Sequence, residues 1–461
     1  MKTSTVPPNI AIEKNAIYEY LILAAITILA AALRFYKLGD WSFWGDEVFS
    51  LSNKVDGFIQ STSVDLIHAT TAVLGTNEWT ARLAPALIGV ISIPLLYFPT
   101  RQILGVGAAL ISAALLAVST WHLYWSQNAR FYALLLLLYT FALLIFYQGI
   151  EKDKPAFIVA ALILFSLAAK ERLLALFFVP VVISFIVLLK ILPFEKPPGL
   201  RLKNLAIFFV PCIGLGIIFA LPFLRDIPAW LSGFGRLNNN PFWLMAGTFY
   251  YIGLPTIVFG AFGALYFLLK KNRAALFFSL GALIPLIAVM GISLFQYTAN
   301  RYVFVCLTSW ILLAAMTVDE IFILVKGNAR IVAVGVLAIL IVGSLSEDWM
   351  YSRYQNGNRD NWKAAFNFVK QQRQPGDLIV SANPEVGAYY LGETVSGFQH
   401  LTTEDLQSNS RIWLVEDLNT RELYPELHSW MVQNARQVAD FDNHVNARTY
   451  TMRVYLYDPS P

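Results

Sequence analysis

The chain has 461 residues, of which 57% are hydrophobic and only 14% are charged. Because a soluble globular chain carries about a quarter charged residues, this composition excludes an ordinary soluble protein and indicates a polytopic membrane protein. The formal net charge of +4 is small for this length, so we expect no nucleic-acid partner.

Long apolar runs follow one another through the first three quarters of the chain. A transmembrane helix needs about 20 mostly apolar residues, so the sequence predicts about eleven of them. The N-terminus lacks a small-residue cleavage site after a short apolar core, and the first run is therefore interpreted as a retained helix. The predicted spans are Ile17–Tyr36, Leu83–Pro99, Val106–Trp121, Phe131–Ile150, Pro155–Ala169, Leu173–Leu192, Leu205–Leu224, Phe242–Leu269, Ala274–Phe295, Tyr302–Leu324 and Ile331–Leu345.

Lysine and arginine gather in alternate short loops, such as "EKPPGLRLK" and "KKNR". Since basic loops stay in the cytoplasm, this pattern predicts a cytoplasmic N-terminus in a multi-pass protein of the plasma (inner) membrane. An odd number of spans then takes the C-terminal part to the extracytoplasmic side.

The composition changes at about Glu347. The following stretch predicts an amphipathic helix, a Pro-Gly-Asp turn and a strand, and then a second strand in "RIWLVED", a helix in "YPELHSWMVQNA" and a closing strand in "RTYTMRVYLYD". We therefore predict a polytopic α-helical membrane domain over residues 1–346, with a first outer loop over 37–82, and a small soluble α/β domain over 347–461.

Asp46 and Glu47 form an acidic pair in "WSFWGDEVFS", directly after the first apolar run. The structural interpretation is that they lie in the first turn of a short helix, where negative charge is favourable. The functional interpretation is a general base within hydrogen-bond reach of an acceptor hydroxyl. Adjacent side chains point in different directions, so we expect one to reach a substrate while the other orients it or pairs with a cation.

Further ionisable residues fall at the outer ends of the predicted spans. Individually, interfacial arginine and lysine can extend to lipid headgroups, but together with the acidic pair they predict a shared anionic site. Arginine binds phosphate in charge-assisted, bidentate pairs, which suits a lipid phosphate. These residues are Arg34, Arg82, Arg130, Lys170, Glu171, Arg172, Arg236 and Arg301.

Several catalytic motifs are missing from the sequence. It contains no GxxxxGK[ST], HExxH or GxSxG pattern, which argues against ATP coupling and zinc-protease or hydrolase chemistry. The five histidines are scattered, and His68 and His122 are interpreted as structural or interfacial. We expect no cofactor and metal-independent chemistry, with a divalent metal as the open alternative.

Three stretches of the membrane half carry a family resemblance: "LRFYKLGDWSFWGDEVFSL", "RLAPALIGVISIPLLYFPTRQILG" and "WHLYWSQNARFYALLLLLYTFALL". The chain resembles the bacterial family 39 glycosyltransferases of the membrane-embedded GT-C superfamily, which includes protein O-mannosyltransferases and lipid A aminoarabinose transferases. "DNWKAAFNFVKQQRQPGDLIV" is similar to the start of the soluble domain in many members. The resemblance implies a polyprenyl-phosphate-linked sugar donor, an outer-face active site and inversion at the anomeric carbon.

The resemblance also implies roles for individual residues. Asp46 matches the family's catalytic carboxylate, with Glu47 beside it. Arg130 matches the arginine of an "ARxYAL" block and Arg301 that of an "RY" pair, both as donor-phosphate ligands. Basic residues often follow the fifth span of members, as Lys170 and Arg172 do here. Possible substrate contacts are Tyr132, Tyr302, Arg82 and His68.

One segment departs from the family pattern. Many members carry an "hPPLYY"-like segment, whereas "DLIHATTAVLGTNEWTARL" is shorter and lacks both prolines, although it keeps His68. The resemblance therefore does not identify the acceptor-binding residues of the first outer loop.

The expected function is transfer of a hexosyl or pentosyl unit from the lipid-linked donor to a lipid, glycan or protein acceptor, with Asp46 as general base. The alternative is a lipid or sugar transporter or flippase without transferase chemistry, which predicts charges near mid-membrane and broken helices at matching positions in two halves. A non-catalytic membrane scaffold or sensor is a further alternative. Such a protein does not require arginines at the outer ends of the spans beside Asp46 and Glu47.

Overall fold

The computed structural model describes residues 8–52, 61–214, 216–217, 240–401, 411–445, 448–449 and 451–459. The chain divides into two compact units, each described separately below. The helical unit comprises Met1–Arg34, Ala86–Ser126 and Phe131–Ser346, and the α/β unit comprises Phe35–Pro85, Gln127–Arg130 and Glu347–Pro461. Residues of the first outer loop thus cluster with the C-terminal residues.

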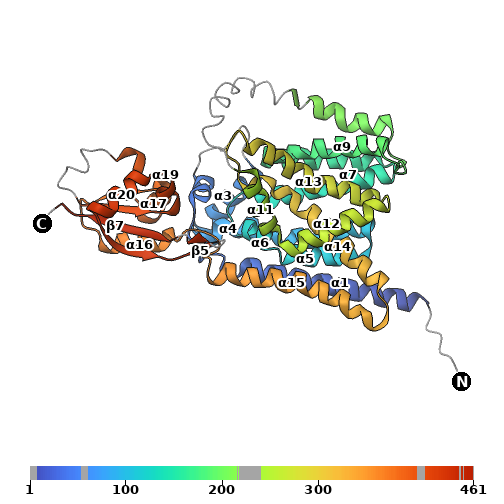
Figure 1. Cartoon of the computed structure of the whole chain (residues 1–461), viewed down its shortest axis with the longest axis horizontal. Coiled ribbons are helices and arrows are strands. Elements are labelled where there is room, and N and C mark those ends of the chain that lie inside the picture. The colour runs from blue at the N-terminus through green and yellow to red at the C-terminus, as the bar shows by residue number, and fades with distance from the viewer. Residues whose placement is uncertain are drawn as a thin grey trace. The chain divides into compact units, whose positions relative to one another are not determined.

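Most predicted spans correspond to helices (Figure 1). Among the described residues, seven helices are long and apolar enough to cross a membrane, or up to nine if two bent pairs each count as one span. The shorter α8 covers the predicted fifth span, and the seventh is described only as a helix over Leu202–Gly214. The labelled helices are α1 (Pro8–Phe35), α4 (Glu78–Leu104), α5 (Val106–Ala117), α6 (Thr120–Ser126), α7 (Tyr132–Glu151), α8 (Pro155–Glu171), α9 (Phe178–Ile191), α11 (Pro241–Ile252), α12 (Leu254–Leu269), α13 (Arg273–Ser293), α14 (Leu307–Leu324) and α15 (Arg330–Arg353), with 3-10 helices η1 (Leu173–Phe177), η2 (Asn300–Cys306) and η3 (Gly327–Ala329).

Two predicted spans are broken. The run Phe242–Leu269 forms α11 and α12, which meet at 98° at Gly253, whose φ of 95° is accessible to glycine and is followed by Pro255 inside the new helix. The run Val106–Trp121 forms α5 and α6, bent by 59°. Apolar composition alone carried no signal for either bend.

Arg34 supports the second bend. Its guanidinium is fully buried and donates to the backbone oxygens of Leu116 (3.2 Å) and Ala117 (2.8 Å), at the C-terminal end of α5. Its Nη2 also lies 2.7 Å from Nδ1 of the buried His122 on α6. A cation at a helix C-terminus satisfies free carbonyls and the helix dipole, so Arg34 and His122 have structural partners inside the bundle.

The α/β unit is built on a five-stranded sheet in the order β2-β1-β3-β7-β4. Strands β2, β1 and β3 are parallel, and β7 pairs antiparallel with both β3 and β4. Its elements are α2 (Gly45–Leu51), α3 (Thr62–Leu74), α16 (Trp362–Gln372), β1 (Leu378–Ser381), α17 (Pro384–Leu391), β2 (Ser396–Gly397), η4 (Phe398–His400), β3 (Ile412–Glu416), α19 (Leu418–Leu423), α20 (Pro425–Asn434), β4 (Arg436–Phe441), β5 (His444–Val445), β6 (Arg448–Thr449) and β7 (Met452–Tyr457).

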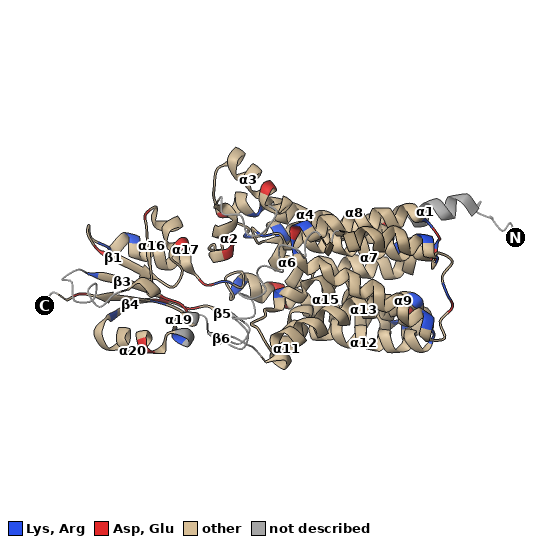
Figure 2. Cartoon of the chain, turned by 90° about the horizontal axis from the view of Figure 1, so that it is seen from above, with Lys and Arg blue, Asp and Glu red and all other residues tan. Residues whose placement is uncertain are grey.

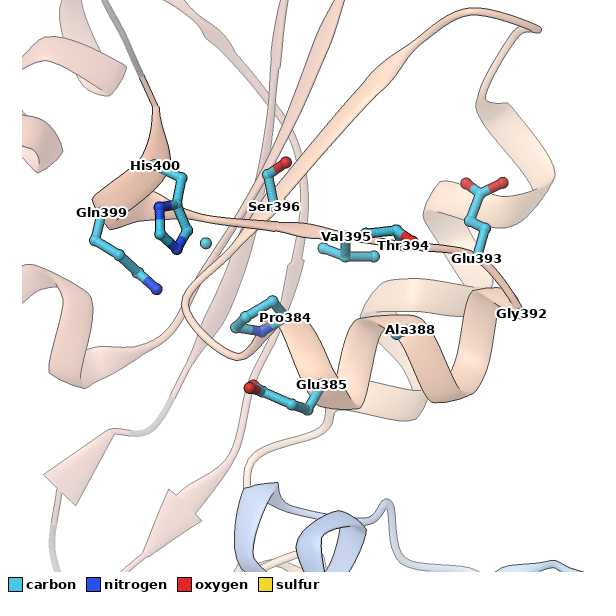
Figure 3. Close-up of a pocket in the computed structure, with 11 residues that line it drawn as sticks. Pro384, Glu385, Ala388, Gly392, Glu393, Thr394, Val395, Ser396, Gln399 and His400 are labelled. Atoms are coloured by element: carbon cyan, nitrogen blue, oxygen red, sulfur yellow. The ribbon is translucent and has the colours of Figure 1, made fainter. Parts of the chain in front are cut away.

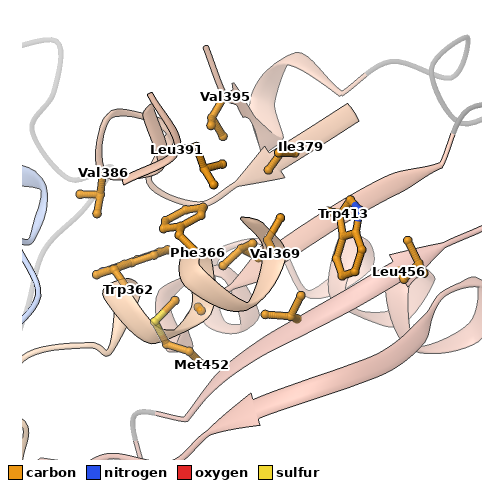
Figure 4. Close-up of a cluster of buried hydrophobic side chains, with 13 residues drawn as sticks. Trp362, Phe366, Val369, Ile379, Val386, Leu391, Val395, Trp413, Met452 and Leu456 are labelled. Carbon is orange, nitrogen blue, oxygen red and sulfur yellow. The ribbon is translucent and has the colours of Figure 1, made fainter. Parts of the chain in front are cut away.

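One of the buried apolar clusters of this unit lies between α16 and the sheet. The apolar face of α16, formed by Trp362, Phe366 and Val369, packs with sheet residues that include Ile379 and Trp413 (Figure 4). The predicted amphipathic helix and the predicted strands are therefore confirmed, together with the fold class of a helical membrane protein carrying a small C-terminal α/β domain.

Candidate functional site

Glu47 is the buried member of the acidic pair. Its carboxylate accepts two 2.8 Å hydrogen bonds from Arg82, one to each oxygen, and a third of 2.8 Å from the backbone N–H of Ala129. Arg359 Nε lies 3.5 Å from Oε2, and none of these three charged side chains is more than 1% exposed. Burial alone would raise the pKa of Glu47, but the charges of Arg82 and Arg359 and these hydrogen bonds hold it below its usual value.

Arg82 is saturated by protein acceptors. Besides Glu47, its guanidinium donates to the backbone oxygens of Leu38 (3.2 Å), Trp41 (3.0 Å) and Ser42 (2.9 Å). All five of its N–H donors are therefore in use, and the side chain is fully buried. These contacts favour a structural role for Arg82 and Glu47, in place of the substrate contact and catalytic role predicted for them.

Asp46, in contrast, keeps 28% of its side chain exposed in the first turn of α2. Arg130 Nη2 lies 4.0 Å from Asp46 Oδ2. The other end of the guanidinium, Nη1, donates to the Asp46 backbone oxygen (2.8 Å) and to Ser50 Oγ (2.9 Å). The structure thus brings the predicted base and the predicted phosphate ligand together within the α/β unit.

Gln127 anchors the segment that carries Arg130. Its Oε1 accepts from Trp41 Nε1 (3.2 Å) and from the Tyr351 hydroxyl (2.8 Å), and its Nε2 donates to the Tyr36 carbonyl (2.8 Å). Sequence reasoning missed Gln127 as a site residue, although a polar "SQN" triplet between apolar runs was an available signal.

His68 lies near the C-terminal end of α2. Its Nε2 donates to the backbone oxygen of Ser50 (2.7 Å), and its side chain is half-buried. The ring therefore supports the short helix that presents Asp46.

Lys170 and Arg172 end α8 in the helical unit. Both are half-buried, and the Arg172 guanidinium carbon lies 5.1 Å from the ring centroid of Phe131. Phe131 follows Arg130 directly in the chain. Arg172 thus lies at the start of the α7 segment.

Tyr132, predicted as a substrate contact, packs inside an aromatic cluster. It is 2% exposed, and its ring centroid lies 3.8 Å from that of Trp125 and 6.2 Å from that of Phe304 on η2. The half-buried Arg301 and Tyr302 lie on the same 3-10 helix, with the Arg301 guanidinium 5.7 Å from the Tyr302 ring centroid. Arg236 lies outside the described residues.

A groove of about 670 Å³ lies between α17 and the edge strand β2 of the α/β unit. Figure 3 shows Glu385 on α17 across this groove from Ser396 and His400. Glu393, also in the lining, forms an ion pair with Arg373. None of the predicted site residues lines this groove.

Over the residues that the structure describes, no three histidine, cysteine, aspartate or glutamate side chains gather closely enough to hold a metal ion. Cys306 is buried and Cys212 is half-buried, and neither forms a disulfide.

Asp360, between α15 and α16, makes the stability of the α/β unit depend on pH. Its Oδ1 is buried without a hydrogen-bond partner among the described residues. Burial and then the charge of Asp417 raise its pKa from 3.8 to about 7, against the opposing charge of Arg421. The folded protein therefore holds a proton that the unfolded chain has already lost, so stability falls as pH rises from about 4 to 7.

Asp360→Asn is expected to remove this contribution and to stabilise the protein at pH 8 by about 1 kcal/mol or more. Thermal unfolding of both proteins at a series of pH values measures the effect. Equal changes in melting temperature with pH in variant and wild type would contradict the assignment.

The comparisons with known proteins bear on the fold. Residues 66–219 match a family model described as Dolichyl-phosphate-mannose-protein mannosyltransferase. The fold is similar to that of ArnT from Cupriavidus metallidurans, with a TM-score of 0.60 and 13% identity over 96% of this chain and 98% of that chain. The chain has the GT-C fold. The resemblance to membrane glycosyltransferases related to O-mannosyltransferases and ArnT is thereby confirmed.

Further GT-C structures are also similar. ArnT from Cupriavidus metallidurans bound to undecaprenyl phosphate gives a TM-score of 0.57 at 13% identity, over 95% of this chain and 98% of that chain. The Archaeoglobus fulgidus oligosaccharyltransferase AglB in complex with an inhibitory peptide and a dolichol-phosphate gives 0.53 at 12% identity, over 88% of this chain and 70% of that chain. No curated protein matches the sequence. The apolar helices and the GT-C fold together make this a multi-pass membrane protein.

Proposed function

We propose that this GT-C protein transfers a hexosyl or pentosyl unit from a polyprenyl-phosphate donor to a lipid, glycan or protein acceptor on the extracytoplasmic face of the plasma membrane. The observation that carries the proposal is the pairing of a partly exposed Asp46 with a buried Arg130. The family-model match over residues 66–219, which includes Arg130, supports a transferase. The solved complexes of ArnT with undecaprenyl phosphate and of AglB with a dolichol-phosphate support a lipid-phosphate donor.

In the proposed reaction, Asp46 accepts the proton of an acceptor hydroxyl while the hydroxyl oxygen attacks the anomeric carbon. The bond between that carbon and the phosphate oxygen breaks, and the configuration inverts. Arg130 stabilises the negative charge that develops on the departing lipid phosphate. Because a lipid phosphate is a good leaving group and arginine supplies positive charge, we propose a metal-independent reaction.

Lys170, Arg172 and Arg301 are proposed as further ligands of the donor phosphate. Support comes from the position of these basic residues at the outer ends of apolar runs and from the charge-assisted pairs that arginine forms with phosphate.

The transporter alternative has one feature in its favour, the two bent helix pairs α5–α6 and α11–α12. Against it, Figure 2 shows most charged residues of the helical unit near the ends of its helices, with an uncharged middle. A transport path would need ionisable groups near mid-membrane.

Arg130→Ala is expected to weaken binding of a polyprenyl phosphate at least about tenfold, because a charge-assisted hydrogen bond contributes about 1.5–3 kcal/mol. Binding is measured on purified protein in lipid nanodiscs, with Arg130→Lys to retain the charge if the alanine variant folds poorly. Arg373→Ala, which removes an ion pair with Glu393 in the same unit, is the matched control. The proposal fails if wild-type protein transfers no sugar from a panel of polyprenyl-phosphate donors, or if both Arg130 variants bind the lipid as wild type does.

A further inference from the structure

Arg359 connects the C-terminal residues to two segments of the candidate site. It lies between α15 and α16, and its side chain is 1% exposed. Its Nη2 donates to the Gln127 backbone oxygen (2.7 Å), its Nη1 to the Gly357 oxygen (2.8 Å), and its Nε lies 3.5 Å from Glu47 Oε2. One side chain therefore holds both α2 and the segment that ends at Arg130.

Tyr390 of α17 makes a second connection. Its hydroxyl accepts from the backbone N–H of Phe43 (2.8 Å) and donates to Glu78 Oε1 (3.0 Å). Lys363 of α16 also contacts Glu78 Oε1, at 3.0 Å. The ring of Tyr389 packs edge-on against Phe43, with the centroids 5.0 Å apart. The loop that leads into α2 is thus fixed from the C-terminal domain.

The first residue of α2 lies against α17 as well. A Cβ on Gly45 would lie 2.8 Å from Nδ2 of Asn383, the residue that precedes α17. Only glycine permits this close approach without moving the amide. Ser42 Oγ also donates to the Asp360 backbone oxygen (2.5 Å).

A helix of seven residues cannot fix its own orientation. Isolated helices shorter than about 12 residues are marginal in water, and α2 runs only from Gly45 to Leu51. Its orientation must therefore come from tertiary contacts. Arg82, Arg130 and His68 supply some of them, and the C-terminal residues Arg359 and Asn383 supply others. A general base has to lie within about 3 Å of the proton that it accepts, and a displacement of about 1 Å can reduce the rate about 100-fold.

We propose that the C-terminal α/β domain positions the general base, with Arg359 and Tyr390 as the positioning residues that orient α2 and hence Asp46. This role rests on the proposed transferase function. It assigns the domain an indirect part in the chemical step. The two side chains act through the orientation of α2 and do not need to touch the substrate.

The test compares Tyr390→Phe and Arg359→Met with wild type in the full-length protein. Both variants are expected to lower kcat at least about tenfold. In Tyr390→Phe, which leaves the contact of Arg359 with Gln127 intact, the Kd for a polyprenyl phosphate should stay within about twofold. Arg359→Lys should recover part of the lost kcat, because an ammonium group can replace either the contact with the Gln127 backbone oxygen or the contact with Glu47. Tyr389→Phe is the matched control, since it keeps the ring on Phe43 and loses a hydroxyl that forms no hydrogen bond within the described structure.

Three results would overturn the inference. One is a wild-type kcat in both variants. Another is a loss of donor binding in Tyr390→Phe equal to its loss of kcat. The third is a loss of activity that only follows the fraction of unfolded protein, measured by thermal unfolding at the assay temperature. Wild-type protein without any transferase activity would refute the proposed function itself, and this role with it.

Discussion

Asp46→Asn is expected to reduce the rate of sugar transfer about 10²- to 10⁴-fold, the usual contribution of a general base. The amide has nearly the same shape as the carboxylate but accepts no proton at neutral pH. Arg130 would keep its hydrogen bonds to the backbone oxygen of residue 46 and to Ser50 Oγ, since neither involves the substituted group. Donor binding should therefore stay close to that of wild type while kcat falls.

Single-turnover transfer from a polyprenyl-phosphate sugar measures this effect. Asp40→Asn is the matched control, because Asp40 is an exposed carboxylate six residues earlier in the same loop. Full transferase activity in Asp46→Asn would contradict the assignment of the base.

Glu47→Gln is expected to destabilise the protein by about 3–5 kcal/mol, the usual result of breaking a buried ion pair. The substitution leaves Arg82 and Arg359 buried without their shared counter-charge. The pKa of Glu47 lies below its usual 4.5, so its contribution is present above about pH 4.5 and is lost as pH falls through the lower folded value. The deficit of the variant should therefore shrink in acid.

Thermal or denaturant unfolding in detergent measures the loss. Glu393→Gln is the control, since Glu393 is exposed in its pair with Arg373, and such pairs contribute about 0–1 kcal/mol. A variant with wild-type stability but little activity would instead return Glu47 to the catalytic role that the sequence predicted.

The acidic pair shows how far sequence reasoning reached. Composition and the "GDE" motif selected two adjacent carboxylates and predicted that they would face in different directions. The choice between them depends on burial, because Glu47 is enclosed by Arg82 whereas Asp46 is partly exposed. This burial arises from packing between segments that are distant in the sequence, so no local sequence pattern predicts which carboxylate is buried.

The contact between Arg359 and Glu47 could not be predicted from the sequence. Arg359 lies 312 residues after Glu47, in a polar stretch with no periodic pattern. The membrane helices were easier to predict, because the length of an apolar run shows directly whether it can span the hydrocarbon core. The bend at Gly253 was missed since the apolar run continues through it, although a glycine followed two residues later by proline was a signal for a break.

The α/β unit is assembled from three separate pieces of the chain: Phe35–Pro85, Gln127–Arg130 and Glu347–Pro461. The ribosome therefore makes the acidic pair early, but more than 300 residues of further chain must follow before Arg359 and Tyr390 exist. Contacts of such large sequence separation form late and slowly in folding. Until the C-terminal residues fold, the ion pair of Glu47 and Arg82 lacks the charge of Arg359. The first outer loop can therefore reach its final structure only after the C-terminal residues have been synthesised.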